Sequence, residues 1–316
     1  MSARAGFIAV ALGACVEVPR PQPPSDTDPW FGDDPTDLDA ERDNDEDADP
    51  REDADGSGPF AELCGQPATL FCDDFEDGLH PVWAADAGHP RLVSGAAREG
   101  VGRTVLELLT YDSVNSSKLL YRFEEQTRVF ARFDVQYATD YDAMGSSVLG
   151  PRFGGSPEWW GSFGRSGEKP RGDDFFVAFL SPIGQIGQDA EWALLAYFAN
   201  MRADTTGTYF GNAFAPLTEP PPMVERGRWS CVEFGLTLNA PGRTDGRADL
   251  SVDSVAQGPF EGLAWRTVPA LAANVFVLDS YDEFAGGAPP SSRPNRVRYD
   301  NVVISAEPVG CLAPGP

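Results

Sequence analysis

The sequence predicts an all-β protein built as a β-sandwich, and three observations carry this prediction. The chain of 316 residues contains 33 glycines and 28 prolines, more than a helical protein of this length tolerates. Runs that alternate apolar and polar residues recur along the chain, whereas no long segment keeps the 3.6-residue period of an amphipathic helix. Turn-forming pairs such as Asp245-Gly246 separate these runs. Many short strands in about 250 residues are typical of a sandwich or jelly roll.

The clearest predicted strand covers residues 129–137. Val129, Phe133 and Tyr137 fall on one side of it, and Arg132 and Gln136 fall on the other. A period of two residues indicates a strand with one buried face. The other predicted strands are 104–109, 118–123, 175–180, 192–198, 229–238, 248–252, 274–278 and 297–304. Strands 175–180 and 192–198 are apolar on both faces, which is typical of central strands that are covered on both sides.

Residues 1–14 predict an export signal. Arg4 gives it a positive start, residues 6–14 are apolar, and residues 12–15 (Leu-Gly-Ala-Cys) resemble the lipobox of bacterial lipoproteins. The resemblance implies that Cys15 carries a diacylglyceride, and several acyl chains on one residue anchor a protein stably. We therefore expect an exported lipoprotein, held by its lipid in the cell envelope, at the outer membrane or the cell surface. The alternative is a chance cysteine in an ordinary signal peptide.

Residues 15–58 are predicted to form an acidic, disordered linker. Between Val16 and Gly58 the chain carries 16 acidic and 3 basic residues, a net charge of −13 out of −25 for the whole sequence. Such a segment has too few apolar residues to offset the loss of chain entropy on folding. The strong excess of negative charge also argues against nucleic acid as a partner, because nucleic-acid binding requires a cationic surface.

Residues 59–316 are predicted to form the folded domain, which contains Cys64, Cys72, Cys231 and Cys311. An even number of cysteines in an exported chain predicts two disulfides, and zinc is disfavoured because closely spaced Cys-x-x-Cys pairs are missing. Three pairings are open. We favour Cys64–Cys72 with Cys231–Cys311, because the first closes a short loop and the second then clamps the end of the chain.

Three motifs resemble the concanavalin A-like polysaccharide lyases that act on alginate and glucuronan. Residues 228–253 begin a strand with Trp, carry Glu233, and continue through Leu-Asn-Ala-Pro-Gly and an Asp-Gly turn to Val-Asp; Ser254 stands where the family has Gly. Residues 71–78 resemble the first strand of that family, and residues 298–305 resemble the last. The resemblance implies a concanavalin A-like (laminin-G, jelly-roll) β-sandwich of two antiparallel sheets.

The resemblance also implies lyase chemistry, which requires a base such as Tyr or Lys, an acid, and charge-stabilising donors such as Arg. In the resembling family these groups stand on central strands, and the corresponding strands here, 175–180 and 192–198, keep only Tyr197 as a titratable hydroxyl. A tyrosine that fills the core is the plainer interpretation of Tyr197. The net charge of −13 on residues 59–316 also disfavours a polyanionic substrate.

We therefore predict a carbohydrate-binding domain without catalysis, with a polysaccharide or cell-surface glycan as its partner. One alternative is a polysaccharide lyase or glycoside hydrolase with a divergent active site, and a weaker one is a protein-interaction module. The candidate ligand-binding residues are Trp159 and Trp160, together with Arg132 and Gln136, because sugars stack on exposed aromatic rings while polar neighbours hold their hydroxyls. Alternatively, the two tryptophans cover an edge of the core.

Glu76 and Asp300 are candidate ligands of a structural calcium ion. Glu76 belongs to an acidic run after the first strand, and Asp300 belongs to the last strand. The first and last strands are commonly neighbours in sandwiches of the resembling kind, and carboxylates combined with backbone carbonyls suit Ca²⁺. The alternative is that these carboxylates cap turns or remain at the surface.

Overall fold

The computed structural model describes residues 59–87, 90–98, 102–110, 116–141, 148–158, 161–182, 190–282 and 295–312. The predicted export signal, Cys15 and the acidic linker lie outside these residues. Among the described residues, no helix has the length and hydrophobicity that a membrane span requires.

The described elements are nearly all strands, which confirms the predicted fold class. Helix α1 (Pro59–Cys64) comes first. The strands are β1 (Thr69–Asp73), β2 (Ala84–Ala87), β3 (Arg91–Ser94), β4 (Thr104–Thr110), β5 (Ser116–Gln126), β6 (Arg128–Tyr137), β7 (Val148–Leu149), β8 (Arg152–Gly155), β9 (Phe176–Leu180), β10 (Leu194–Tyr197), β11 (Asn212–Phe214), β12 (Trp229–Thr237), β13 (Gly246–Val252), β14 (Val255–Ala256), β15 (Phe260–Leu263), β16 (Ala273–Asp282) and β17 (Asn295–Ser305).

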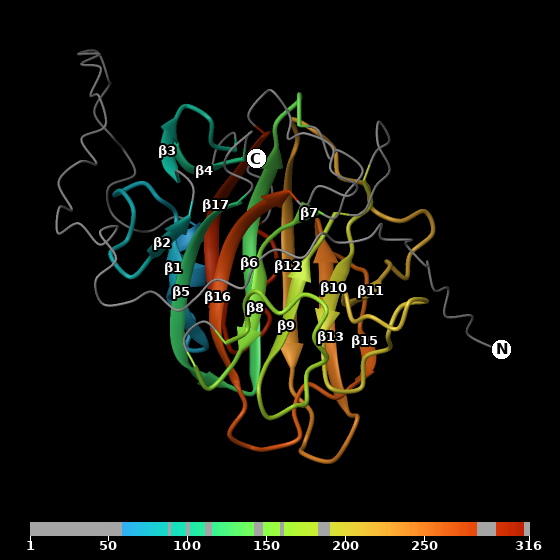
Figure 1. The fold of residues 1–316 in the computed structure, drawn as a ribbon. Coiled ribbons are helices and arrows are strands. Elements are labelled where there is room, and N and C mark those ends of the chain that lie inside the picture. Colours follow the sequence, from blue (N-terminus) through green and yellow to red (C-terminus); the bar gives the residue numbers. More distant parts are fainter. Residues whose placement is uncertain are drawn as a thin grey trace, which may run out of the picture.

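These strands form two antiparallel sheets that lie face to face (Figure 1). The nine-stranded sheet has the order β14-β13-β12-β6-β17-β4-β3, with β1 added to β17 and β15 added to β13. The eight-stranded sheet has the order β11-β10-β9-β8-β16-β5-β2, with β7 added to β16. Several neighbours, such as β6 and β17 in one sheet and β5 and β16 in the other, come from distant parts of the sequence, as expected for a jelly-roll sandwich.

The core lies between the two sheets and is rich in aromatic rings. Phe133 and Phe234 from the nine-stranded sheet meet Phe153 and Phe276 from the eight-stranded sheet, with ring centroids 5.1–6.4 Å apart. All four side chains are fully buried. Burying one such side chain stabilises the fold by about 1.5–3 kcal/mol, so this contact between the sheets is a major part of the core.

All the strands predicted from periodicity are present, but the prediction for residues 129–137 was wrong in one respect. Val129, Phe133 and Tyr137 face the core as expected. The opposite face of β6 is also largely buried, because side chains and the end of the chain lie over it. Arg98 reaches Asp134 there with a nitrogen–oxygen distance of 3.2 Å.

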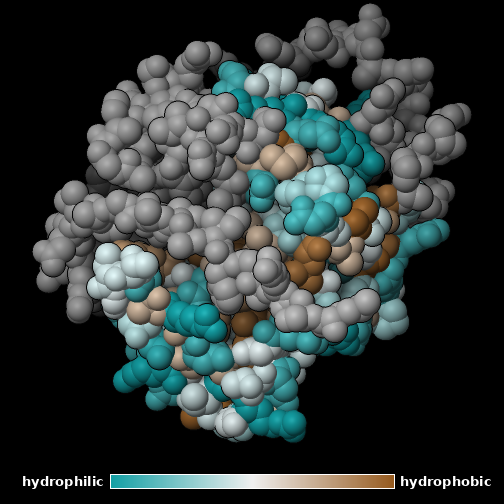
Figure 2. Space-filling view, turned by 90° about the vertical axis from the view of Figure 1, so that its right-hand side faces the viewer, coloured by the Kyte–Doolittle hydropathy of each residue, from teal (hydrophilic) through white to brown (hydrophobic). Residues whose placement is uncertain are grey.

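One edge of the sandwich is formed by β11, β13, β14 and β15, and it faces the viewer in Figure 2. Hydrophobic residues reach the surface there in small groups among hydrophilic ones. Leu217 and Val255, joined through the hydrogen bonds of Gln257, are 64% and 54% exposed. Scattered exposed aliphatic residues of this kind are normal on protein surfaces.

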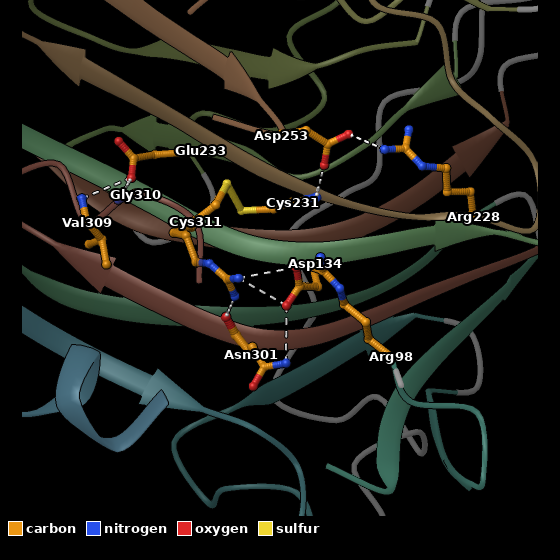
Figure 3. Close-up of a disulfide and its surroundings, with 11 residues drawn as sticks. Arg98, Asp134, Arg228, Cys231, Glu233, Asp253, Asn301, Val309, Gly310 and Cys311 are labelled. Carbon is orange, nitrogen blue, oxygen red and sulfur yellow. Dashed lines mark hydrogen bonds and ion pairs between the residues drawn. A yellow bond between two sulfur atoms is a disulfide. The ribbon is translucent and has the colours of Figure 1, made fainter. Parts of the chain in front are cut away.

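Both favoured disulfides are present: Cys64–Cys72 joins α1 to β1, and Cys231–Cys311 joins β12 to the segment after β17. Figure 3 shows the second bond beside Glu233, whose Oε2 accepts hydrogen bonds from the backbone N–H groups of Val309 and Gly310. We call residues 306–311 the C-terminal strap. The strap is therefore fixed to the outer face of the nine-stranded sheet by the disulfide, by the two hydrogen bonds to Glu233 and by an ion pair between Glu307 and Arg128 of β6.

Candidate functional site

The outer face of the eight-stranded sheet, the side turned away from the other sheet, carries an unusual mixture of side chains. On β16, Phe276 and Leu278 point into the core, so Val277, Asp279 and Tyr281 stand on the outer face. The outward positions of the neighbouring strands follow from the register: Lys118, Leu120 and Arg122 of β5, Arg152 and Gly154 of β8, Val177 and Phe179 of β9, and Leu195 and Tyr197 of β10.

Arg152 lies near the middle of this face and is paired with Asp279. The two side chains are 9% and 1% exposed, and an Arg152 nitrogen lies 3.0 Å from Asp279 Oδ2. The Arg152 guanidinium also lies over the rings of Phe163 and Phe179, at 4.5 and 5.2 Å from their centroids. Planar guanidinium groups favour this combination of stacking and ion pairing. The charge of Arg152 is therefore balanced within the protein.

Part of the outer face is covered by residues 161–163. A Cβ atom placed on Gly154 would lie 2.6 Å from Ser162 Oγ and 3.1 Å from a methyl carbon of Val275. Only glycine leaves room for such a close approach. Phe163 completes the cover by packing on Leu120, Val275 and Val277.

A second group of polar residues lies where β5 begins and β16 ends. Lys118 stands directly opposite Asp279, and Tyr281 is two residues further along β16 on the same face. Lys118 and Tyr281 are both partly exposed. Diagonal neighbours in an antiparallel pair lie about 7–8 Å apart, so the two side chains are within reach of one ligand. Asp279 and Tyr281 are not among the residues predicted from the sequence, because the predicted strand 274–278 ends at Leu278.

Tyr197 lies on the same outer face but far from Lys118. It is 8% exposed, and its ring meets Phe179 edge-on with centroids 6.3 Å apart. Strands β16, β8 and β9 separate β10 from β5, so four strand spacings, about 19 Å, lie between the two residues. Tyr197 and Lys118 are therefore too far apart to act on one glycosidic bond.

Arg132 and Gln136 do not belong to this face, because both are on β6 of the other sheet. Arg132 is fully buried: it donates hydrogen bonds to Asn301 O (2.8 Å) and to Asp134 (3.2 Å). Burial lowers the pKa of Arg132, although the negative charge of Asp134 opposes this shift. The prediction that Arg132 contacts a glycan was wrong, because the side chain is used inside the protein.

Gln136 is partly exposed on the same sheet as Arg132. It donates to Gly227 O at 3.1 Å and accepts from Arg298 at 3.0 Å. Both ends of its amide therefore have partners within the protein. Trp159 and Trp160 lie outside the described residues.

The carboxylates named for calcium are held differently from one another. Glu76 Oε1 accepts the backbone N–H groups of Arg103 and Thr104, at 2.5 and 2.8 Å. Asp300 is 1% exposed, and its Oδ2 has no hydrogen-bond partner among the described residues. Burial, reinforced by the negative charge of Asp134, raises the pKa of Asp300 to about 9. Within the described part of the chain, no three acidic, histidine or cysteine side chains come together as a metal site.

Solved polysaccharide lyases share the fold described above. Alginate lyase Aly36B matches with a TM-score of 0.53 and 14% identity, over 72% of this chain and 98% of that chain. Alginate lyase vAL-1 from Chlorella virus gives 0.53 and 14%, over 75% and 99%. The endo-β-1,4-glucuronan lyase of the fungus Trichoderma reesei gives 0.53 and 16%, over 75% and 95%. At such identities the similarity establishes the fold alone, and it confirms the jelly roll that the sequence motifs predicted.

No protein-family model matches this chain, and no curated protein matches its sequence.

Proposed function

We propose that this chain is an exported lipoprotein whose β-sandwich domain binds a polysaccharide without cleaving it. The observation that carries the proposal is the pairing of Arg152 with Asp279 near the middle of the outer face. A uronate lyase requires a cation that can neutralise the substrate carboxylate. The guanidinium in this position is instead buried, lies over two aromatic rings and is balanced by Asp279.

The apolar character of the surrounding face supports the same proposal. Val177, Phe179 and Leu195 occupy outward positions on the central strands, where acid and base groups would be needed for catalysis. The fold is shared with solved polysaccharide lyases, and the centre of its outer face is apolar. This combination supports recognition of a glycan rather than its cleavage. The partner is then a polysaccharide or a cell-surface glycan.

Anchoring through Cys15 would place this domain at the cell envelope, at the outer membrane or the cell surface. The acidic residues 15–58 would act as a spacer between the lipid and the sandwich, because like charges repel and extend a chain. Both parts of the proposal rest on the sequence alone.

A structural calcium ion also remains a proposal, and one observation supports it. Asp300 Oδ2 is buried without a hydrogen-bond partner among the described residues, and a cation would compensate its charge. Asp134 is already satisfied by Arg98, Arg132 and Asn301. Asp300, backbone carbonyls and water would therefore have to supply most of the ligands.

One specific observation favours the alternative of a divergent lyase. Lys118 and Tyr281 stand within reach of each other on the outer face, and Lys and Tyr are residue types that can act as base and acid. If this pair were catalytic, the chemistry would lie at the end of the face where β5 begins. It would not lie at the centre of the face.

Incubation of the purified full-length chain with a glycan array and with uronate polymers separates these functions. We expect glycan binding and no rise in the ultraviolet absorbance of unsaturated products. An absorbance rise that Lys118→Met or Tyr281→Phe abolishes, while the control Arg122→Met retains it, would establish the lyase instead. Absence of binding and turnover on all glycans would favour a protein partner.

A further inference from the structure

The edge of the sandwich that is formed by β1, β2 and β5 lies on the left in Figure 1. A row of aromatic rings is gathered at this edge. Phe71 of β1 stacks on Tyr121 of β5, with ring centroids 4.4 Å apart and an interplanar angle of 27°. Phe123 follows Tyr121 along β5 at 5.9 Å. His80 meets Phe71 edge-on at 5.3 Å. Four rings from three separate segments of the chain are thus gathered at one edge.

These rings are only partly covered by the residues around them. Leu119, Tyr121 and Phe123 share the inner face of β5, and Leu119 is fully buried, whereas Tyr121 and Phe123 are not. Phe71 is also partly exposed, and His80 is exposed. Strand β1 belongs to the other sheet and contacts β5 through Phe71 and Tyr121. Because β1 has five residues and β5 has eleven, β1 is too short to cover the rings of β5 completely.

The row rests on a rigid support. Trp83 is 7% exposed and lies edge-on to Phe71 and Tyr121, at 5.2 and 6.1 Å between centroids. Its Nε1–H donates a 2.7 Å hydrogen bond to Asp73 Oδ2, and Asp73 Oδ1 accepts the backbone N–H of Phe75. Fixed rings lose little conformational entropy when a ligand binds. The Tyr121 hydroxyl donates one long hydrogen bond, 3.5 Å, to Leu70 O within the described part of the chain.

Carboxylates lie beside the row. Asp73 accepts the Trp83 Nε1–H, Asp74 follows Asp73 in the chain, and the exposed Glu124 and Glu125 follow Phe123 in β5. Carboxylates accept hydrogen bonds from sugar hydroxyls, but they repel the carboxylates of uronates and the sulfate groups of sulfated sugars. Arg122 stands on the opposite face of β5.

We propose that Phe71, His80, Tyr121 and Phe123 form a binding site for a neutral hexose polysaccharide, separate from the outer face of the eight-stranded sheet. The C–H faces of the sugars would pack against the exposed parts of the rings, and their hydroxyls would bond to the Tyr121 hydroxyl and the flanking carboxylates. This site deepens the proposed function, because it rests on glycan binding and assigns that binding to one edge and one class of sugar.

Titration of the full-length chain with neutral and uronate oligosaccharides tests this site. The double variant Tyr121→Leu, Phe123→Leu keeps apolar volume but removes the rings, and we expect it to bind the neutral glycan about tenfold more weakly or worse. Tyr209→Leu is the matched control, because Tyr209 is also a partly exposed ring packed on the core, beside Lys169. It should bind like the parent chain. Melting temperatures of both variants establish that they fold.

The outcomes separate this site from the proposed function. Undiminished glycan binding by the folded double variant would overturn the edge site and leave the proposed glycan binding intact. A preference for uronate chains over neutral ones would also overturn it. Failure of the parent chain to bind any glycan would reject both the site and the proposed function.

Discussion

Arg152 and Asp279 form a buried ion pair across two neighbouring strands of the eight-stranded sheet, with 3.0 Å between nitrogen and oxygen. The backbone oxygen of Asp279 also accepts a 2.7 Å hydrogen bond from the hydroxyl of Tyr299, which belongs to the other sheet. The pair therefore connects three layers: the segment with Phe163, the eight-stranded sheet and the nine-stranded sheet. Its contribution to stability can be measured by breaking it from either side.

Replacing Arg152 by Met should destabilise the fold by about 3–5 kcal/mol, because it leaves the buried Asp279 charge without its partner. The double variant Arg152→Met, Asp279→Leu should lose less, because no charge then stays buried. Denaturant unfolding of the three proteins measures the difference. Arg296→Met, which breaks a half-exposed pair with Asp140, should cost about 1 kcal/mol or less. A double variant at least as unstable as Arg152→Met alone would contradict the interpretation.

The two disulfides should contribute unequally to stability. Cys231–Cys311 spans 80 residues and Cys64–Cys72 spans 8. Chain-entropy arguments give about 4.5 kcal/mol for the longer loop and about 2.5 kcal/mol for the shorter one. Replacing each pair by alanine and measuring unfolding by denaturant tests this order. Equal losses in the free energy of unfolding would mean that contacts of the strap in the folded state, rather than the entropy of the unfolded chain, determine what the disulfides contribute.

The folded chain should lose stability as the pH rises through the range in which Asp300 ionises. The folded pKa of Asp300, about 9, lies above its ordinary value of 3.8, so the folded state holds a proton that the unfolded state releases. Stability linked to this group is complete below about pH 4 and is lost progressively up to about pH 9. In the presence of a chelator, Asp300→Asn should flatten the dependence of Tm on pH. Asp173→Asn, at an exposed position, should leave the parent profile unchanged; a parallel profile for Asp300→Asn would refute the assignment.

Calcium should stabilise the folded chain at the pH values at which ionisation of Asp300 destabilises it. If the ion binds Asp300, added Ca²⁺ raises the Tm of the parent chain at pH 8, because binding to the folded state stabilises it by mass action. Asp300→Asn should not respond. A magnesium control at equal concentration separates specific binding from screening of charge. Identical shifts in parent and variant would exclude Asp300 as a ligand.

Lipid anchoring is tested at Cys15, because the thiol is the atom that would carry the lipid. The Cys15→Ser chain should move from the membrane fraction to the soluble fraction of an expressing bacterium, because the acyl chains that Cys15 would carry are then missing. Fractionation with detection of the domain measures the change. Cys15→Ser protein that stays in the membrane fraction would rule out the lipoprotein assignment.

The strands were predictable from the sequence because the alternation of apolar and polar residues is a local property of the chain. Both disulfides were predictable because an even number of cysteines in an exported chain indicates pairing. The environment of Arg132 was not predictable. Alternation separates the two faces of β6, but it does not reveal that Arg98 and the C-terminal strap cover the polar one. Asp279 was missed for a related reason: a buried acid looks like the end of a strand until its partner, 127 positions earlier at Arg152, is placed beside it.

The bond between Cys64 and Cys72 also determines how mechanical load would enter the domain. A pull transmitted through the chain before Pro59 reaches α1, crosses the disulfide and acts on β1 at Cys72, which pairs with Val303 of β17. Residues 65–71 lie outside this line of force. Unravelling of α1 can then lengthen the chain only up to the crosslink, and further extension requires shearing of the β1–β17 ladder.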